Sequence, residues 1–394
     1  MNLLIHDLSE KEFESISAKY EGWEIISDKG NIKPCVGCFG CWIKNPGECV
    51  IKDGYHQMGS LIHKADEVVV ISRYTYGGFS SFIKNVFDKS ISWVLPYFEV
   101  YEGEMHHKKR YPEDKKMRFI FRGNDLTDED RKKAEQYVNA VCRNLHGKVL
   151  GVEFQEMDVL SDKAAIDENE NLKAVQIQES DPEKVILLNC SLRGDKANTK
   201  HILNKVGEKL TGIVEDINLS KYISKTDELI SMLSSAEKIV FGTPLYVDGI
   251  PSAPLRLMEK IERINKITPL GKKKIYAIVN MGLYESVQMN NLLSMVKTWC
   301  EITGFTYGGA LAVGAGEMIG PMLSGKDISK GPTKMVAQGI NKLSEAINSS
   351  DMIDDVYTEP YKFPRAFYMG IANMGWPMDA KKNGLKKKDI LKQK

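Results

Sequence analysis

The chain has 394 residues, of which 42% are hydrophobic and 27% are charged. Its 54 Lys and Arg residues almost cancel its 53 Asp and Glu residues, so the formal net charge is +1. This composition is typical of a folded chain with two domains and excludes a disordered or fibrous protein. It also excludes a global positive field, so we expect neither a nucleic-acid partner nor a membrane partner.

The N-terminal residues and the cysteines bear on location. No apolar run approaches the ~20 residues of a membrane-spanning helix. The segment Met1–Asp7 lacks the basic start and apolar core of a signal peptide, so we expect a cytoplasmic protein. Seven unevenly spaced cysteines in a reducing compartment do not indicate a disulfide framework. Metal or redox chemistry is the better interpretation.

In the first half of the chain, strand-length apolar runs alternate with helical patterns. Strands are predicted at residues 2–6, 68–71 and 117–121, and helices at 82–87 and 128–143. After the first strand, Ser9 followed three residues later by Glu12 predicts a capping box at a helix start. Asp7 and Glu10 in the same turn would repel a phosphate, so we do not expect this turn to bind one.

The second half repeats this order of elements. Strands are predicted at residues 184–189, 236–241 and 274–279, and helices at 201–210, 253–259 and 288–303. The strand, Gly-containing turn and helix that follow residue 236 correspond to those that follow residue 67. This correspondence indicates an internal duplication.

Alternating strands and crossover-length helices predict α/β domains, each with a doubly wound parallel sheet wrapped on both faces by helices. A polar, acid-rich stretch separates the halves and is interpreted as a connection. We therefore predict a first domain at residues 1–160, a linker at 161–183 and a second domain at 184–348. Residues 349–394 form a C-terminal extension that is basic at its end.

The turn after strand 184–189 has the composition of an anion site. It runs Cys190-Ser-Leu-Arg-Gly-Asp-Lys-Ala-Asn-Thr199 into a helix, so backbone amides and the positive helix end would face a phosphate. Ser191, Asn198 and Thr199 can donate further hydrogen bonds. Arg193 can add charge. The alternative for this turn taken alone is a helix cap beside a solvated arginine.

Two more loops are predicted at the same edge of the sheet, where ligands of open parallel sheets bind. The turn at 243–252 would lay backbone and an aromatic ring against a flat heterocycle through Pro244, Leu245, Tyr246 and Val247. The loop at 280–284, which contains Gly282, would close the far side. Three adjacent loops indicate one binding site.

The order of these loops resembles the NADPH-dependent FMN reductase branch of the flavodoxin-like superfamily. The first loop of that branch is similar to Gly-Ser-x-Arg-x-x-Ser-Asn-Thr and the second to Ser-Pro-x-Tyr. Here the first loop is one residue longer, and Ala197 replaces the second Ser. The resemblance covers most of residues 184–348.

The resemblance implies two flavodoxin-like, three-layer α/β/α domains in tandem. It also implies FMN as cofactor, with the phosphate at Ser191, Arg193, Asn198 and Thr199 and the ring at residues 244–247. NAD(P)H is the implied electron donor. An independent second FMN in the first half is not expected.

The first half instead carries four closely spaced cysteines, Cys35, Cys38, Cys41 and Cys49, in a C-x2-C-x2-C-x7-C pattern. Four thiolates suit an iron–sulfur cluster or zinc. The spacing resembles the compact motif of iron–sulfur flavoproteins, which are flavodoxin-like dimers with FMN and a 4Fe–4S cluster. Structural thiols without a metal, or a loop that faces the substrate, are the alternatives, since spacing alone does not fix the metal. Cys142, Cys190 and Cys300 are interpreted as ordinary buried residues.

These features predict an FMN-dependent NAD(P)H oxidoreductase that passes electrons to a small-molecule or protein acceptor, in one version through a 4Fe–4S cluster. The alternative is an electron-transfer module without small-molecule turnover, and a zinc-stabilised binding protein ranks third. Tyr246 and the loop 74–79 are candidates to line the acceptor pocket. The chain would be a pseudo-dimer, with further homo-oligomerisation left open.

Three features rank lower. Residues 106–110, two histidines and three basic residues, are predicted to form an exposed basic loop. The aromatic segment 363–376 is expected to pack on a domain, with flavin coverage or contact with another subunit as alternatives. The terminal lysines are expected to be solvated.

Overall fold

The computed structural model describes residues 1–157, 175–325 and 327–394. The chain forms two compact units. Unit 1 comprises Met1–Glu99, His106–Asn171 and Ile371–Lys394, and unit 2 comprises Val100–Met105 and Leu172–Gly370. Within the described ranges, no helix combines the length and apolar character needed to cross a membrane.

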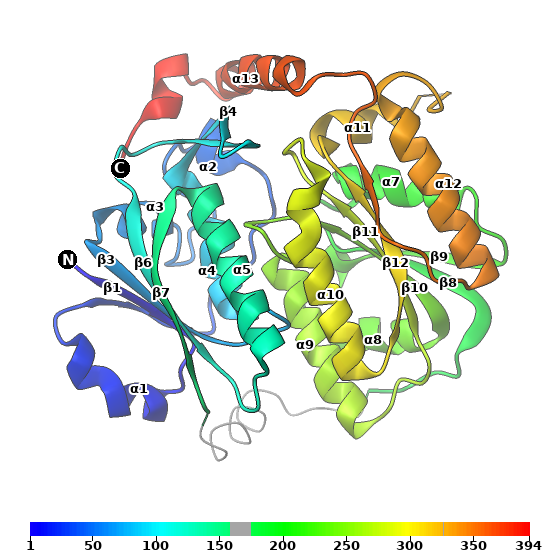
Figure 1. Cartoon of the computed structure of the whole chain (residues 1–394), viewed down its shortest axis with the longest axis horizontal. Coiled ribbons are helices and arrows are strands. Elements are labelled where there is room, and N and C mark those ends of the chain that lie inside the picture. The colour runs from blue at the N-terminus through cyan, green and yellow to red at the C-terminus, as the bar shows by residue number, and fades with distance from the viewer. Residues whose placement is uncertain (158–174, 326) are drawn as a thin grey trace. The chain divides into compact units, whose positions relative to one another are not determined.

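Unit 1 contains a five-stranded parallel sheet with the order β2-β1-β3-β6-β7 (Figure 1). Ranked along the chain, its strands follow the order 2-1-3-4-5, which is the flavodoxin-like order. The sheet therefore confirms the predicted doubly wound fold for this half. The strands are β1 (Leu3–His6), β2 (Glu24–Ile26), β3 (Glu67–Arg73), β6 (Lys115–Arg122) and β7 (Gly147–Gln155).

Apolar side chains attach helices to the unit 1 sheet. Leu4, Val69 and Ile71 form a buried cluster with residues of the first helix and the turn after it. The predicted capping box is confirmed: Ser9 accepts from the Glu12 amide, and the Glu12 carboxylate accepts from the Ser9 amide. Within residues 1–157, the helices of unit 1 are α1 (Glu10–Ile16), α2 (Gly40–Ile43), α3 (Met58–Lys64), α4 (Ser81–Lys89) and α5 (Asp128–Leu145).

A hairpin, β4 (Val94–Tyr101) and β5 (Glu104–Lys109), is inserted before β6. It corrects the prediction of an exposed basic loop at residues 106–110. His106 and Arg110 are buried. The His107 ring packs against Trp42 and Phe98. Histidine can be buried as a neutral ring that packs on aromatics, and the Arg110 guanidinium is satisfied by backbone carbonyl oxygens.

Unit 2 contains a six-stranded parallel sheet with the order β13-β12-β11-β10-β8-β9 (Figure 1). Apart from the added edge strand β13, the order is again 2-1-3-4-5. The second predicted doubly wound domain is therefore confirmed as a fold. The strands are β8 (Asp181–Asn189), β9 (Ile213–Asn218), β10 (Ala236–Pro244), β11 (Lys274–Asn280), β12 (Thr306–Val313) and β13 (Val356–Thr358).

Helices cover both faces of the unit 2 sheet (Figure 1). One face packs Ile202 and Leu203 of α7 with Ile340 and Leu343 of α12 over the central strands. On the other face α9 contacts α10, and Trp299 Nε1 donates to the Met258 carbonyl oxygen. These helices are α7 (Asn198–Gly207), α8 (Thr226–Ser234), α9 (Ser252–Ile267), α10 (Asn290–Thr303), α11 (Gly316–Met322) and α12 (Lys334–Ser349).

The predicted linker, residues 161–183, lies largely outside the described residues. Strand β8 begins at Asp181, so it includes the last three residues that were predicted to belong to the linker. The predicted extension contains β13 and the long helix α13 (Arg365–Lys382). Within this extension, the residues up to Gly370 belong to unit 2 and those from Ile371 onward belong to unit 1.

Candidate functional site

The turn between β8 and α7 lies at the carboxyl edge of the unit 2 sheet. The Cys190 amide donates to the Gly242 carbonyl of β10 at 2.7 Å. Asn189 Nδ2 donates to the Gly194 carbonyl at 2.9 Å. Helix α7 begins at Asn198, three residues earlier than predicted, and has no side-chain cap. An uncapped helix start leaves backbone amides for an anion.

The polar side chains predicted to hold a phosphate gather at this turn. Ser191 is buried, and its Oγ accepts from the Arg193 amide at 3.4 Å. The Thr199 hydroxyl donates to Asn280 Oδ1 of β11. Asn198 is buried as well, yet among the described residues its Nδ2 has no hydrogen-bond partner. A buried amide donor without a partner costs about 1–3 kcal/mol, which an acceptor on a ligand would relieve.

Helix α11 lies against the start of α7. A Cβ atom on Gly320 would come within 2.7 Å of the Asn198 side chain. Glu317 Oε1 lies 3.2 Å from Arg193 Nη1. The Ser191 hydroxyl, the Arg193 guanidinium and the unpartnered Asn198 amide fit a phosphate, whereas the Thr199 hydroxyl hydrogen is already donated to Asn280. The Glu317 carboxylate is the anion with which that phosphate would compete.

The turn after β10 carries the residues predicted to face a flat ring. Leu245 and Tyr246 are partly exposed, whereas Pro244 and Val247 are buried. The Leu245 amide donates to the Asn280 carbonyl at 2.9 Å, and Tyr246 forms a β-bridge with Gly249. The Leu245 hydrogen bond holds the turn against the end of β11, and the β-bridge closes the turn on itself.

The same turn occurs after β3 in unit 1. Thr75 and Gly78 form the equivalent β-bridge. The two residues between the bridged pair have positive φ in each unit, namely Tyr76 and Gly77 in unit 1 and Val247 and Asp248 in unit 2. The two halves thus share a local conformation at the point where the sequence indicated a repeat.

The loop after β11 is held from two sides. The Gly282 carbonyl accepts from the Tyr368 hydroxyl at 2.6 Å. A Cβ on Gly282 would lie 3.5 Å from Glu317 Cγ. Gly282 therefore lies close to α11, which also covers the turn after β8.

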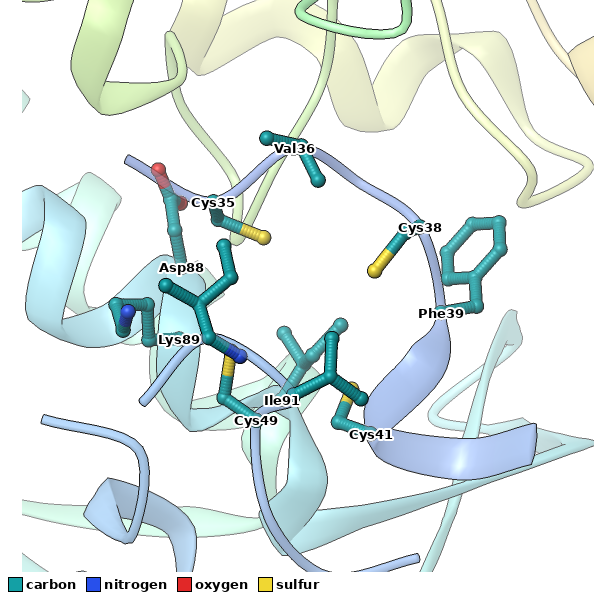
Figure 2. Close-up of a pocket in the computed structure, with 11 residues that line it drawn as sticks. Cys35, Val36, Cys38, Phe39, Cys41, Cys49, Asp88, Lys89 and Ile91 are labelled. Atoms are coloured by element: carbon teal, nitrogen blue, oxygen red, sulfur yellow. The ribbon is translucent and has the colours of Figure 1, made fainter. Parts of the chain in front are cut away.

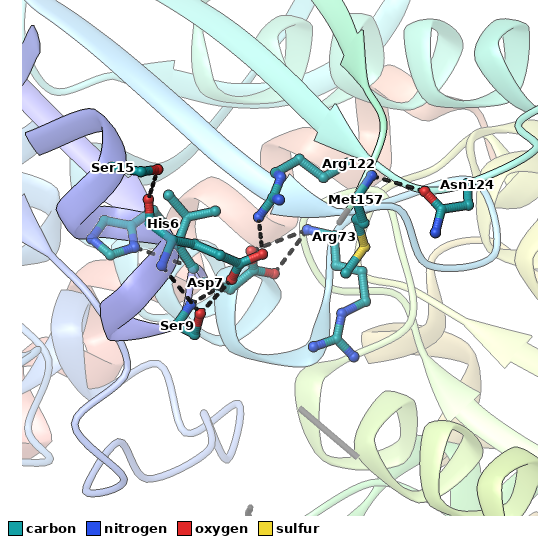
Figure 3. A network of polar contacts seen from close by, with 10 residues as sticks. His6, Asp7, Ser9, Ser15, Arg73, Arg122, Asn124 and Met157 are labelled. Atoms are coloured by element: carbon teal, nitrogen blue, oxygen red, sulfur yellow. Dashed lines mark hydrogen bonds and ion pairs between the residues drawn. The ribbon is translucent and has the colours of Figure 1, made fainter. Parts of the chain in front are cut away.

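The corresponding turn of unit 1 is filled by the protein's own carboxylates. Figure 3 shows the Asp7 carboxylate, which accepts from the Arg73 amide at 2.9 and 3.1 Å. Arg122 Nη1 lies 2.6 Å from Glu12 Oε1. Burial raises the pKa of Asp7, against the lowering effect of its hydrogen bonds and of the nearby arginines. The acidic side chains thus occupy the hydrogen-bond donors that a phosphate would need.

The four cysteines of the C-x2-C-x2-C-x7-C pattern line one pocket in unit 1 (Figure 2). The pocket contains about 310 Å³ of empty space, part of it open solvent. Positive φ angles at Gly37 and Phe39 curl the chain around it, and Cys41 lies in the short helix α2. The remaining lining is mostly apolar and consists of Val36, Phe39, Val50, Ile51, Asp88, Lys89 and Ile91.

Metal ions and clusters differ in the arrangement of cysteines that they require. Among the residues with described positions, no group of three or more His, Cys, Asp or Glu side chains converges closely enough to hold a metal ion. A single zinc ion requires every sulfur at ~2.3 Å from one point. A 4Fe–4S cluster offers one iron to each thiolate, so the sulfurs need not meet at one point.

Burial and nearby charged side chains set the protonation of the pocket thiols. Burial, followed by the negative charge of Asp88, raises the pKa of Cys35 to about 12. Burial also raises the pKa of Cys41 well above its usual value. Lys89 pairs with Asp53 at 2.7 Å, whereas the Arg110 guanidinium donates to backbone carbonyls. Without a metal, burial favours protonated thiols here.

The three isolated cysteines behave as predicted. Cys142, Cys190 and Cys300 are all buried. Burial raises the pKa of the Cys190 thiol well above its usual value and that of Cys300 to about 12. A protonated, enclosed thiol is a poor nucleophile.

Sequence reasoning missed Glu317, Lys89 and Arg110. Glu317 is more than 120 residues from Arg193 in the chain, and no local pattern links the two. Lys89 is the last residue of α4, a position where the sequence predicts a solvated lysine, yet its side chain is buried. For Arg110, the flanking histidines and lysines suggested a surface loop. No alternation of buried and exposed positions marks this strand, because the consecutive residues Met105 and His106 are both buried.

Comparison with known proteins gave only distant structural likenesses. An FMN-dependent NADH-azoreductase from Bacillus anthracis str. Ames Ancestor, in complex with FMN, is 14% identical with a TM-score of 0.30. The match covers 42% of this chain and 99% of the azoreductase chain. The Trp repressor binding protein from Bacillus subtilis has 14% identity and a TM-score of 0.28, covering 36% of this chain and 98% of its own.

A longer match is the rubredoxin oxygen:oxidoreductase from Desulfovibrio gigas. It has 12% identity and a TM-score of 0.27, and it covers 86% of this chain and 75% of its own. No family model and no curated protein matches the chain. At such identities and TM-scores, these likenesses assign no function.

Proposed function

We propose that this protein is an FMN-dependent oxidoreductase that takes electrons from NAD(P)H and passes them to a small-molecule or protein acceptor. The observation that carries the proposal is the unpartnered Nδ2 of buried Asn198 at the uncapped start of α7. It lies in a turn rich in donors at the carboxyl edge of a flavodoxin-order sheet.

Each loop of unit 2 has a distinct task in this proposal. Ser191, Arg193, Asn198 and Thr199 would hold the phosphate, and the helix α7 would stabilise its charge. Residues 244–247 and Gly282 would contact the ring. Bound FMN would supply hydride acceptance and electron transfer. The chain's own residues would orient the ring and exclude water, so no conspicuous acid or base is required.

We further propose that Cys35, Cys38, Cys41 and Cys49 hold a 4Fe–4S cluster. Support comes from their common pocket and its mostly apolar lining. The buried Arg110 supports the proposal further, because its guanidinium donates to carbonyl oxygens and lies close enough to Cys41 to lower the pKa of that thiol against the effect of burial. A cation without a carboxylate partner offsets part of the negative charge that four thiolates bring.

The test is FMN binding to the full chain and to two double variants. Replacement of Arg193 and Asn198 by Ala removes two phosphate donors and should weaken binding at least ~100-fold. The matched control, Asp7→Asn with Ser9→Ala, changes the equivalent turn of unit 1 and should leave affinity unchanged. Equal losses in both variants, or no FMN binding by the native chain, would reject the proposal. FMN binding without oxidation of NADH or NADPH would instead favour the electron-transfer module.

A further inference from the structure

Helix α13 (Arg365–Lys382) has the reverse of the usual surface pattern. Its polar groups face inward: the Tyr368 hydroxyl donates to the Gly282 carbonyl, and the Asn373 side chain bonds both backbone atoms of Phe98. Trp376 packs edge-on against Phe39 and Trp42. These contacts use one face of α13 and leave the opposite face exposed.

The outward face of α13 is apolar. Phe367, Ile371, Met374 and Met378 are 68%, 56%, 71% and 63% exposed. No charged residue occurs between Ala366 and Met378. A contiguous exposed patch of large apolar side chains commonly marks an interaction site, because removal of that surface from water is favourable. This face, called the α13 stripe below, consists of those four side chains.

The spacing within the α13 stripe is four, three and four residues. This order reads the same in both directions along the helix. Two copies of the helix that cross in opposite directions would therefore place Phe367 against Met378 and Ile371 against Met374. An isologous contact of this kind needs one self-complementary patch, which is what a two-fold dimer provides. The 4-3-4 spacing is also that of the a and d positions that pair helices.

Area and charge favour a second copy as the occupant. At ~200 Å² for a large side chain, the exposed fractions amount to on the order of 500 Å² per copy and ~1,000 Å² for a pair, near the lower limit for a specific interface. A Cβ on Gly370 would meet no atom within 4 Å, so a partner helix can approach there. Opposed helices also place the exposed Lys381 and Lys382 of one copy near Arg365 of the other, whose charge is paired with Glu285.

We propose that the α13 stripe is a homodimer interface in which two copies of α13 pair in opposite directions. The interface uses a different face of α13 from the one that contacts Gly282 and Phe39.

The first test is the solution mass of the full chain by sedimentation at ~50 μM. The native chain should have twice the mass of one copy, and Met374→Glu, at the centre of the stripe, should have the mass of one. The control Ile267→Glu changes a similarly exposed apolar residue at the end of α9 and should stay dimeric. A monomeric native chain, or a dimeric Met374→Glu variant, would overturn the proposal.

Orientation is tested by a charge pair. Phe367→Glu alone and Met378→Lys alone should each weaken the dimer, and the double variant should recover it, because opposed helices bring the new Glu and Lys together. A double variant weaker than both single variants indicates parallel helices and contradicts the proposed arrangement. Binding of monomeric native chain to vesicles containing phosphatidylserine would assign the stripe to a membrane surface and also overturn the proposal.

Discussion

At the scale of single residues, Arg193 joins the phosphate turn to α11. Its guanidinium pairs with Glu317 at 3.2 Å, although it is one of the groups proposed to hold a phosphate. Both partners are partly exposed, so solvent screens the pair and its net contribution to stability is small. A bound phosphate and the Glu317 carboxylate compete for the same cation.

This competition predicts the effect of Glu317→Gln. Removal of the carboxylate should tighten FMN binding by about three- to tenfold, since one competing charge is lost while every donor remains. Quenching of flavin fluorescence measures the affinity. Glu345→Gln, at an exposed position of α12, removes the same charge from unit 2 and should change nothing. Weaker binding in Glu317→Gln would mean that Glu317 supports the site.

Histidine burial predicts how stability depends on pH. Burial lowers the pKa of His107 to about 3, against the raising effect of hydrogen bonds to the Pro96 and Leu95 backbone and with further lowering by His106 and His146. In the unfolded chain a histidine has a pKa near ~6.5. Below that pH the unfolded state takes up a proton that the folded state refuses, so stability falls as the pH is lowered from about 6.5 towards 3.

The His107→Phe variant tests this dependence. It keeps an aromatic ring beside Trp42 and Phe98 but cannot titrate. Between pH 7 and pH 5 the native chain should lose about 2 kcal/mol more in free energy of unfolding than the variant. Urea unfolding at both pH values gives the difference. His201→Phe, a partly buried position on α7, is the control. An identical loss in the native chain and the His107 variant would show that His107 is not buried as a neutral ring.

At the scale of elements, the contact between α3 and the 3-10 helix Ser90–Trp93 supports the cysteine pocket. Gly59 of α3 lies so close that an added Cβ would come within 2.2 Å of Ser92 Oγ and 2.8 Å of the Trp93 amide nitrogen. Ile91, in the same short helix, lines the pocket. The close packing of Gly59 against Ser92 and Trp93 thus helps to position Ile91, which forms part of the pocket lining.

Gly59→Ala should therefore destabilise the chain by about 1–3 kcal/mol, the usual cost of overpacking. Gly375→Ala provides the contrast, because an added Cβ there meets nothing within 4 Å. In the middle of α13 that change should be neutral or stabilise by about 0.5–1 kcal/mol. Denaturant midpoints decide between these outcomes. A neutral Gly59→Ala would mean that the α3 contact gives way easily.

The elements also show what sequence could predict. Strands such as β3 and β10 and the capping box of α1 follow from local apolar patterns and hydrogen-bonding side chains, and each was predicted within a few residues. The β4–β5 hairpin was missed because its buried histidines and Arg110 are stabilised by distant aromatic rings and carbonyls. The cover that α11 forms over Asn198 was missed for the same reason, since Gly320 and Asn198 are far apart in sequence.

At the scale of the whole molecule, two sheets of the same strand order carry different chemistry. Unit 1 has four cysteines around one pocket, and its first turn is filled by Asp7 and Glu12. Unit 2 has an uncapped α7 and an unpartnered donor at Asn198. The proposed cofactors are therefore divided between the units.

This division predicts that each cofactor can be lost separately. After anaerobic purification the native chain should contain about four iron and four sulfide per chain. Cys41→Ser should lose most of the iron, because one thiolate ligand is gone, and should keep its affinity for FMN. Iron and sulfide assays with an absorption spectrum measure both. Absence of iron from the native chain would remove the cluster while leaving the flavin proposal intact.

The most direct measurement is the stoichiometry of FMN binding to the full chain, obtained by titration with the protein well above the dissociation constant. One FMN per chain is predicted, because the turn after β8 offers donors and the turn after β1 offers carboxylates. Two FMN per chain would contradict the difference between the units. None would contradict the flavin site itself.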